Sequence, residues 1–213
     1  GLCPLPVTSQ ALTVTAILTC GSEAQKQRWL PQLAAGSMIG ALGLYDEANW
    51  IAPEAIQVTG EHSADQITLN GSKPFVNDAA AATHLLLAVQ SNTGLGLAMI
   101  PTEAVRISAQ PTMDLTKPMA SVDLTGASLP VDDWLPMTAD QLAYLCNCGA
   151  VATTAEMVGA GAALVHMTSD YAKQRVQFGK PIGQYQGVKH RLADLYVDLE
   201  SYRSLCYYAA WAI

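Results

Sequence analysis

The chain is organised around residues 171–182, which read YAKQRVQFGKPI and stand between two long segments with helical apolar spacing. This stretch and the residues after it place a guanidinium, an amide, an aromatic ring and the start of a helix close together, at Arg175, Gln177, Phe178 and near Gln184. A phosphate attached to a flat ring fits such a group. The competing interpretation is that the basic residues solvate a helix junction and that Phe178 belongs to the core.

Basic residues gather around this stretch although the chain as a whole is acidic. Lys and Arg number 11 against 18 Asp and Glu, which gives a formal net charge of -7 and a pI near 4.9. The acidity excludes a general binder of nucleic acid or of anionic membranes. Five bases lie within residues 171–191 with no acid among them, which predicts a local anion site. They are Lys173, Arg175, Lys180, Lys189 and Arg191.

Length and composition indicate a globular protein of the cytoplasm. The 213 residues are 50% hydrophobic and can bury a substantial core. We find no apolar run near the roughly 18 to 20 residues of a membrane span, so we expect no membrane insertion. The sequence does not begin with a signal-peptide pattern, and its five cysteines are widely scattered. Cys146 and Cys148 form a C-x-C without a second ligand pair, so we expect free thiols and no metal site.

Helical patterns occur at both ends of the chain. Thr8–Cys20 has helical apolar spacing, and Ser22 with Gln25 forms a capping box that opens a second helix ending at Gly36. We expect these two helices to pack as an antiparallel pair. Near the other end, the spacing predicts two long helices, about 139–173 and 184–213, that pack antiparallel.

Between the helical regions, residues 38 to about 130 have the short apolar runs and turn residues of a β domain. The clearest hairpin joins 66–69 to 72–76 through Asn70-Gly71, a pair that favours a type I′ turn. Further strands are predicted at 84–89, 97–100, 105–108 and 120–124. The fold class is therefore α+β, with a small central antiparallel barrel or sandwich.

Residues 171–182, with Tyr185-Gln186 and residues 189–194, closely resemble the helical signature of acyl-CoA dehydrogenases. Three more stretches resemble the same family in the same order, namely 21–31 with Gly36, 70–73 and 209–211. The resemblance spans nearly the whole chain. It implies a remnant of an N-terminal helical domain at 1–37, a central β domain at 38–135 and the first two helices of a C-terminal bundle at 136–213, with the chain truncated at both ends.

The resemblance also implies FAD as the cofactor. It assigns Arg175 to the flavin pyrophosphate, typically that of a neighbouring subunit, and a bidentate guanidinium suits phosphate oxygens. Its companions in the same stretch and on the following helix are Gln177, Phe178, Gln186 and Val188. On the β domain, the positions expected near the flavin ring are Leu44, Tyr45, Phe75 and Asn77. Phe75 as a plain core residue is the alternative.

One segment departs from the family pattern. Where the family usually has T-E-P followed by A-G-S-D, residues 45–50 read YDEANW, so the small hydroxyl residues expected against the cofactor are missing. This variant resembles a divergent actinobacterial type, as does the DLTKP at 114–118. Some members of that type pair unlike subunits and act on bulky CoA thioesters such as steroid side chains.

The catalytic base is not identified in this sequence. Desaturation between Cα and Cβ needs a carboxylate to remove the α-proton. The family's common base lies in a C-terminal region that this chain lacks, and its alternative site falls at Gly149, which has no side chain. Glu156, two helical turns further on, is the remaining candidate, with a solvent-facing or structural role as the alternative.

The leading hypothesis is an FAD-dependent acyl-CoA dehydrogenase of lipid degradation, in a homo- or hetero-oligomer (dimer or tetramer) that passes electrons to an electron-transfer flavoprotein. The acyl-CoA substrate could be fatty, branched or steroid. One alternative is a non-catalytic structural subunit that completes the site of an unlike partner. Another is an acyl-CoA oxidase on the same scaffold, and the last is an α+β module without a cofactor.

Overall fold

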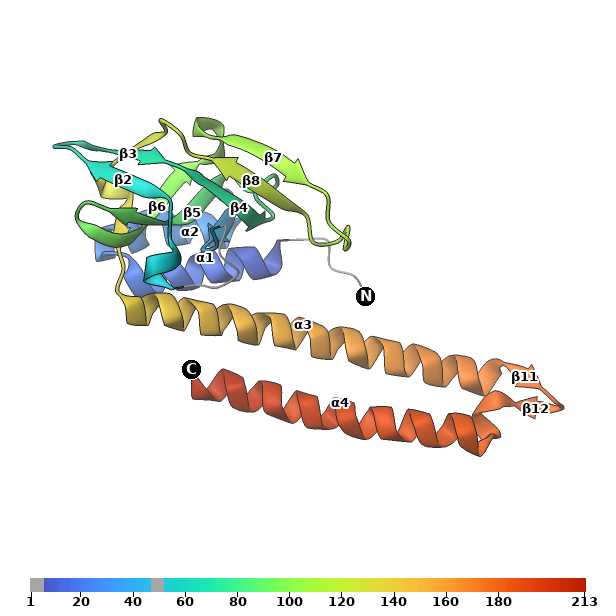
Figure 1. The fold of residues 1–213 in the computed structure, drawn as a ribbon. Helices are drawn as coiled ribbons and strands as arrows, with labels where there is room; N and C mark the ends of the chain where they lie inside the picture. The colour runs from blue at the N-terminus through green and yellow to red at the C-terminus, as the bar shows by residue number, and fades with distance from the viewer. Residues whose placement is uncertain (1–5, 47–51) are drawn as a thin grey trace. The chain divides into compact units, whose positions relative to one another are not determined.

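The computed structural model describes residues 6–46 and 52–213. The described residues form two compact units, one ending at Cys146 and the other running from Asn147 to Ile213. The first unit holds two helices and two β-sheets, and the second holds two long helices joined by a short hairpin (Figure 1). The fold is therefore of the predicted α+β class.

The first unit begins with α1 (Val7–Cys20) and α2 (Glu23–Ala35), close to the predicted limits. The predicted capping box is confirmed: the Gln25 N–H donates to Ser22 Oγ at 3.3 Å, and the Ser22 N–H donates to Gln25 Oε1 at 2.9 Å. Gly36 ends α2 in the left-handed region, at φ 72°. Each signal is local, which explains why the sequence alone predicts this part of the fold.

Two sheets form the β region. The large sheet has the strand order β10-β6-β5-β2-β3-β9, with β1 also paired to β5, and the small sheet has the order β4-β8-β7. The large-sheet strands are β1 (Gly40–Gly43), β2 (Thr59–His62), β3 (Gln66–Asn70), β5 (His84–Ser91), β6 (Gly94–Pro101), β9 (Ser128–Pro130) and β10 (Trp134–Pro136). The small-sheet strands are β4 (Ser72–Asn77), β7 (Arg106–Gln110) and β8 (Met119–Asp123). Strands thus occur at the four later predicted positions.

The expectation of a purely antiparallel barrel or sandwich is wrong for part of this region. Strands β1 and β2 both pair with β5 in parallel, and the described strands close no barrel. The reason lies in β5, whose residues 85–89 are all buried. Alternate side chains belong to two core clusters, Leu85 and Leu87 to one and Leu86 and Ala88 to the other. A strand buried on both faces has no apolar alternation from which the direction of its neighbours could be predicted.

The two core clusters lie on opposite faces of the large sheet. On one face, Leu85 and Leu87 share a cluster with Val76 and Val122 of the small sheet. On the other, Leu86 clusters with residues of α1, α2 and the first turns of α3 (Ala139–Gln174). The helical residues of this second cluster are Ala16, Ile17, Trp29, Leu33, Leu142 and Leu145. The large sheet is therefore the middle layer of the first unit.

The predicted Asn70-Gly71 hairpin is wrong, although both of its strands exist. Strand β3 pairs with β2 and β9 in the large sheet, whereas β4 pairs with β8 in the small sheet. Only Gly71, at φ 118°, has a positive φ, whereas a type I′ turn requires one at both central residues. The chain therefore turns a corner between two sheets at this point.

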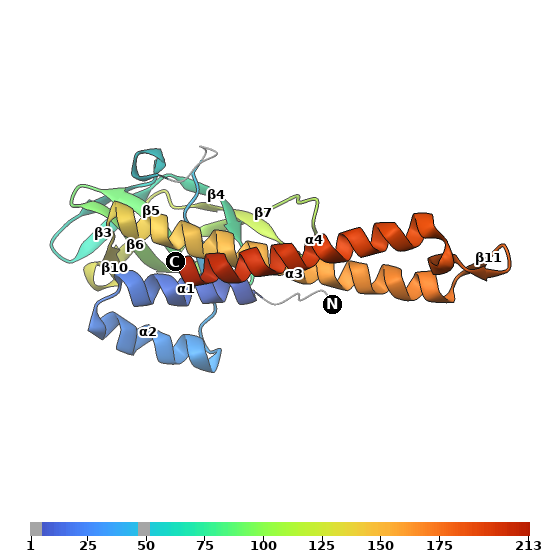
Figure 2. The ribbon, with the colours of Figure 1, turned by 90° about the horizontal axis from the view of Figure 1, so that it is seen from below.

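The second unit contains the rest of α3, which is followed by β11 (Val176–Gln177), β12 (Lys180–Pro181), a 3₁₀ turn (Ile182–Gln184) and α4 (Gln186–Ala212). Figures 1 and 2 show α3 and α4 antiparallel and side by side, as predicted. A Cβ atom at Gly161 would lie 3.4 Å from Leu199 Cδ1, so Gly161 of α3 faces Leu199 of α4.

One described helix, α3, meets the length and composition of a membrane span although it contains no continuous apolar run of that length. One 18-residue window of this helix has a mean hydropathy of 1.4, which meets the requirement of a span by length and composition. The apolar residues of α3 are interrupted at Thr153, Thr154 and Glu156. A search for continuous apolar runs therefore does not detect it.

Candidate functional site

Four of the predicted site residues lie in the first unit, at the end of β1 and along β4. Tyr45, Phe75 and Asn77 are exposed, and the alternative that Phe75 packs in the core is wrong because 47% of it is exposed. Leu44 differs, since its side chain is buried in a core cluster. The two segments are neighbours, because a Cβ atom on Gly43 would lie 3.0 Å from Val76 Cγ2.

A β-bulge in β4 turns Phe75 and Asn77 outward. Lys73 pairs with Val122 and Val76 pairs with Ala120, so three residue steps on β4 oppose two on β8. As a result Lys73 and Val76 are both buried, and Phe75 and Asn77 are both exposed. The bulge contains Pro74, which has no N–H to donate to the ladder. The strand thus presents an aromatic ring and an amide on the same face.

A buried ion pair joins the end of β1 to the start of this bulge. Lys73 Nζ lies 2.9 Å from Asp46 Oδ1, and the two side chains are 0% and 2% exposed. The second Asp46 oxygen accepts the Gln57 N–H at 2.6 Å. Burial lowers the pKa of Lys73, and the charge of Asp46 together with its hydrogen bond opposes that shift. The Asp46 carboxylate of the atypical 45–50 segment is therefore paired with Lys73.

Sequence reasoning did not identify this pair. Lys73 was part of a family signature without an assigned role, and Asp46 belonged to a segment notable only for what it lacks. Lysine and aspartate are rarely buried unless they are paired. The available signal for a buried ion pair was therefore a lysine at the start of a predicted strand. The remainder of the departing segment, residues 47–50, lies outside the described residues.

The other predicted site residues lie in the second unit, on and after the β11–β12 hairpin. Its two-residue turn is Phe178-Gly179, with φ values of 54° and 81°, the left-handed pair of a type I′ turn. Phe178 is 93% exposed, so the alternative of a core position is wrong. The Arg175 N–H donates to Tyr171 O and Arg175 O accepts the Ile182 N–H, each at 2.8 Å. Arg175 therefore stands at the base of a closed hairpin.

Tyr185, whose contacts the sequence did not predict, lies against this turn. Its hydroxyl donates toward Gln177 O at 3.0 Å and Phe178 O at 3.3 Å. Its ring meets the Phe178 ring edge to face, with 6.5 Å between centroids, and Lys180 Nζ lies 4.4 Å from the centre of the Tyr185 ring. Tyr185 thus contacts both Phe178 and Lys180.

Next to the hairpin, a groove of about 360 Å³ lies between the end of α3 and the start of α4. Lys173 and Lys189 both line it. Lys173 also pairs with Asp170 at 3.1 Å, so an acid from just outside residues 171–191 contacts the basic cluster. Gln186 is exposed on the first turn of α4, and Val188 is half-buried. The structure thus gathers the hairpin group within this unit and the Tyr45, Phe75 and Asn77 group within the other.

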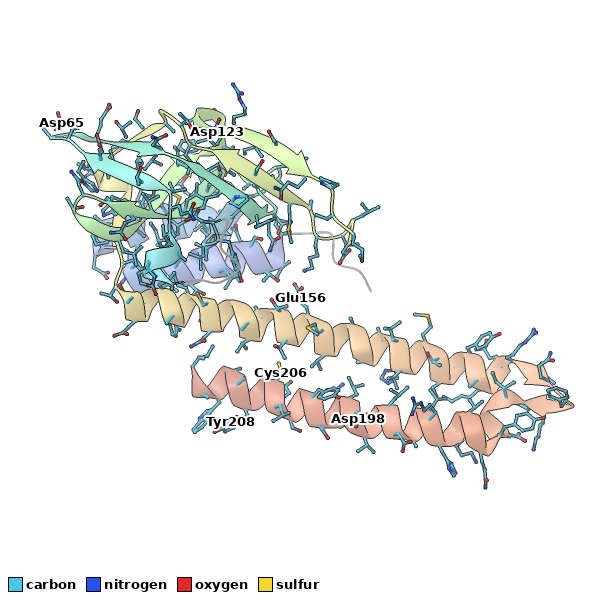
Figure 3. The ribbon with its side chains drawn as sticks, viewed as in Figure 1. Asp65, Asp123, Glu156, Asp198, Cys206 and Tyr208 are labelled. Atoms are coloured by element: carbon cyan, nitrogen blue, oxygen red, sulfur yellow. The ribbon has the colours of Figure 1, made fainter. Side chains whose placement is uncertain are left out.

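A catalytic base is not evident among the residues that the structure describes. Gly149 lies within α3 and carries no side chain. Glu156 is exposed on α3, on the far side of that helix from α4, whereas Cys206 of α4 lies on the side toward α3 (Figure 3).

The cysteines and possible metal ligands show no further centre. Cys20, Cys146, Cys148 and Cys206 are free thiols. Burial raises the pKa of the Cys20 thiol to about 11, so this group stays protonated at neutral pH. Within residues 6–46 and 52–213, no three His, Cys, Asp or Glu side chains gather as metal ligands.

Two protein-family descriptions match this chain. "Acyl-CoA dehydrogenase, N-terminal domain" matches residues 1–37, and "Acyl-CoA dehydrogenase, C-terminal domain" matches residues 142–213. The second match contains most of α3 and all of α4. This match explains the apolar composition of α3, because the helix belongs to a known protein domain.

Individual relatives agree with these matches. An acyl-CoA dehydrogenase of Bacillus subtilis is 30% identical over 208 residues, covering 91% of this chain and 54% of the relative. The acyl-CoA dehydrogenase IpdE2 of Mycolicibacterium smegmatis is 43% identical over 96 residues, 45% of this chain and 28% of the relative. A glutaryl-CoA dehydrogenase from Mycobacterium smegmatis, solved in complex with FADH2, superposes with a TM-score of 0.85 at 25% identity, covering 94% of this chain and 54% of that one. The chain spans about half the length of the curated relatives it matches over most of its own length.

Proposed function

This chain belongs to the acyl-CoA dehydrogenase family, and we propose that it is part of an FAD-dependent enzyme that desaturates an acyl-CoA thioester between Cα and Cβ. The observation that carries the proposal is the exposed hairpin bearing Arg175, Gln177 and Phe178, which lies inside the matched C-terminal domain. The relative solved with FADH2 supports the choice of cofactor.

The chemistry of the exposed side chains fits a flavin dinucleotide. Among the described residues, the Arg175 guanidinium has no ion-pair partner, so its planar donors are available to pyrophosphate oxygens. Phe178 offers an exposed aromatic face for a flat ring. In the first unit, Phe75 and Asn77 would contribute a ring and an amide hydrogen-bonding group toward the flavin.

The desaturation reaction requires different contributions from the cofactor, the catalytic base and the residues of this chain. When bound, FAD supplies a two-electron acceptor for the hydride that leaves Cβ. A carboxylate removes the α-proton, and exclusion of water from the site raises the basicity of that group. The role proposed for this chain's residues is therefore to bind and orient the cofactor. Arg175 would contact the pyrophosphate of a neighbouring subunit's flavin, and the Phe75 to Asn77 face of β4 would lie beside the ring of a flavin held by the first unit.

Two observations favour a second candidate, a non-catalytic subunit that completes the site of an unlike partner. Asp46 of the atypical segment is held by Lys73 and is not available to a ligand. Gly149, at the family's alternative position for the base, has no side chain. Under this alternative, the flavin bound by Arg175 belongs to the partner.

The remaining parts of the proposal are finer than the family assignment. We propose electron transfer to an electron-transfer flavoprotein, with an oxidase that reacts with dioxygen as the alternative, and assembly as a dimer or tetramer. A fatty, branched or steroid acyl-CoA is the proposed substrate class. A cytoplasmic protein without membrane insertion is also proposed, because the one described helix that meets the criteria of a span lies in the matched domain.

The test is the flavin content of the protein purified in its native assembly. Replacing Arg175 by Ala should weaken FAD binding by roughly one to two decades, because a charge-assisted bidentate contact contributes about 1.5 to 3 kcal/mol. Arg175→Lys should recover part of the affinity, since lysine keeps the charge but loses the planar fork. Arg106→Ala, at an exposed arginine of β7, is the matched control and should leave FAD binding unchanged.

Three outcomes separate the possibilities. Weaker binding in Arg175→Ala together with reduction of the flavin by acyl-CoA supports the dehydrogenase. Full flavin occupancy in that variant would make Arg175 a structural residue and remove the main support for the site. Flavin bound only when an unlike partner is co-purified would favour the non-catalytic subunit.

A further inference from the structure

We propose that Tyr185 is a positioning residue that holds the Phe178-Gly179 turn closed and thereby fixes where Gln177 and Phe178 are presented. The inference rests on the proposed function for its link to flavin, but its physical basis is the hairpin itself. Tyr185 donates its hydroxyl to the backbone of the turn and has no assigned role in binding.

The turn needs external support because its sequence is a poor one for its conformation. A type I′ turn places both central residues in the left-handed region, which Asn and Gly tolerate and a bulky side chain disfavours. Phe178 adopts φ 54° there while 93% of it is exposed, so burial of the ring does not compensate for the strain. The strain must be offset by contacts elsewhere in the hairpin.

The hairpin itself provides few contacts. Strands β11 and β12 have two residues each and pair only with each other. A two-stranded hairpin of this length is at most marginally stable in water. The contacts of Tyr185 with the turn therefore carry a large share of what holds it closed.

Tyr185 is itself fixed at the start of α4. Its N–H donates to Ile182 O at 3.1 Å, and its carbonyl accepts the Val188 and Lys189 N–H groups at 3.1 and 2.9 Å. The backbone of Tyr185 thus belongs to the helix start while its hydroxyl reaches Gln177 O and Phe178 O. One residue links the orientation of the turn to a 27-residue helix.

The ring and the hydroxyl of Tyr185 can be separated by substitution. The edge-to-face contact with Phe178 and the contact with Lys180 Nζ involve the ring, which Tyr185→Phe retains. The same substitution removes only the hydroxyl and its hydrogen bonds. A matched control is Tyr196→Phe, which deletes the hydroxyl of an exposed tyrosine on α4.

The experiment measures two properties of the assembled protein, amide hydrogen exchange of residues 176–181 without flavin and the dissociation constant for FAD. In Tyr185→Phe, we expect exchange in this segment to accelerate and FAD affinity to fall by about three- to tenfold, the effect of one hydrogen bond. Exchange within α3 and α4 should stay unchanged. Tyr196→Phe should match the unmodified protein in both measurements.

The outcomes distinguish this inference from the proposed function. If Tyr185→Phe exchanges at the same rate as Tyr196→Phe, Tyr185 does not hold the turn and the inference is overturned. If exchange accelerates but FAD affinity is unchanged, the positioning role is overturned while the flavin proposal stands. If the unmodified protein takes up no FAD, the proposed function fails, and faster exchange in Tyr185→Phe would still support Tyr185 as the residue that holds the turn.

Discussion

Two Xaa-Gly pairs in this chain adopt conformations that their residue types do not favour. Asn70-Gly71 has the sequence of a tight hairpin and instead forms a corner between two sheets. Phe178-Gly179 has an unfavourable residue at its first position and forms a type I′ hairpin. The comparison teaches that the partners available to the flanking segments can decide the turn against local preference.

At the corner, the two flanking strands pair with other strands and not with each other. Strand β3 lies between β2 and β9, and β4 lies at the edge of the small sheet beside β8. Ile67 and Leu69 of β3 share a core cluster with Val76 of β4, so the corner is formed around buried side chains. The Lys73 and Asp46 pair adds a second constraint just after the corner.

At the hairpin, the two helices bring the ends of the turn together and Tyr185 secures it. Every residue from Arg175 to Lys180 is exposed, so no core cluster dictates its conformation. Because the corner is formed around buried residues, substitutions there should lower the free energy of unfolding of the whole protein. Substitutions at the exposed hairpin should instead cause local opening of the hairpin.

The largest expected effect comes from Lys73→Met, which removes one member of the buried pair beside the corner. Asp46 would remain buried without a counter-ion, and breaking such a pair typically lowers the free energy of unfolding by about 3 to 5 kcal/mol. Urea-induced unfolding followed by tryptophan fluorescence measures this loss, since Trp29 and Trp134 are buried in the same unit.

Two further variants define what that result means. Lys26→Met removes a partly exposed lysine whose partner Glu23 is exposed to water, so it should change stability by less than about 1 kcal/mol. The double variant Lys73→Met with Asp46→Asn should recover part of the loss, because the asparagine is uncharged and keeps an acceptor for the Gln57 N–H. Equal stability of Lys73→Met and Lys26→Met would contradict the constraint assigned to the buried pair.

The sequence predicted the elements of this fold better than their pairing. The limits of α1, α2 and α3 follow from local signals such as the Ser22 and Gln25 capping box. Strand direction depends on which distant strand is adjacent, and β5, buried on both faces, gave no indication that β1 and β2 would pair with it in parallel. Local preference likewise assigned Asn70-Gly71 to a hairpin that the core does not allow.

The candidate site divides in a similar way. A continuous motif placed Arg175, Gln177 and Phe178 together between the two long helices, and the structure shows that this stretch is an exposed hairpin. The Tyr185 contacts and the Lys73 to Asp46 pair were missed, because each joins groups whose proximity depends on how the backbone turns. Whether the predicted residues bind flavin stays a prediction that the Arg175 variants test.

An intermediate effect is expected for Gly71→Ala, which probes the backbone of the corner. A side chain at φ 118° is strained, and its Cβ atom would also lie 3.3 Å from Val58 Cα, a backbone atom that cannot move alone. We expect a loss of about 1 to 3 kcal/mol in unfolding free energy. Gly94→Ala is the matched control, since Gly94 has φ 123° and no neighbour within 4 Å. The control measures the effect of backbone strain alone. If Gly71→Ala lowers the free energy of unfolding no more than Gly94→Ala does, the contact with Val58 contributes nothing.

The smallest expected effect, in Asn70→Ala, bears most directly on the comparison. If Asn70-Gly71 were a type I′ turn, Asn70 would be left-handed and alanine would cost roughly 1 kcal/mol or more. In the structure Asn70 is the last residue of β3, has no positive φ and is exposed, so replacing it should change the free energy of unfolding by no more than about 0.5 kcal/mol. Urea unfolding of Asn70→Ala beside Gly71→Ala measures both under one condition. A near-silent Asn70→Ala next to a costly Gly71→Ala is the signature of a corner, because only the glycine then has a conformation that alanine cannot adopt freely. Comparable losses in both variants would restore the hairpin and remove the contrast with Phe178-Gly179.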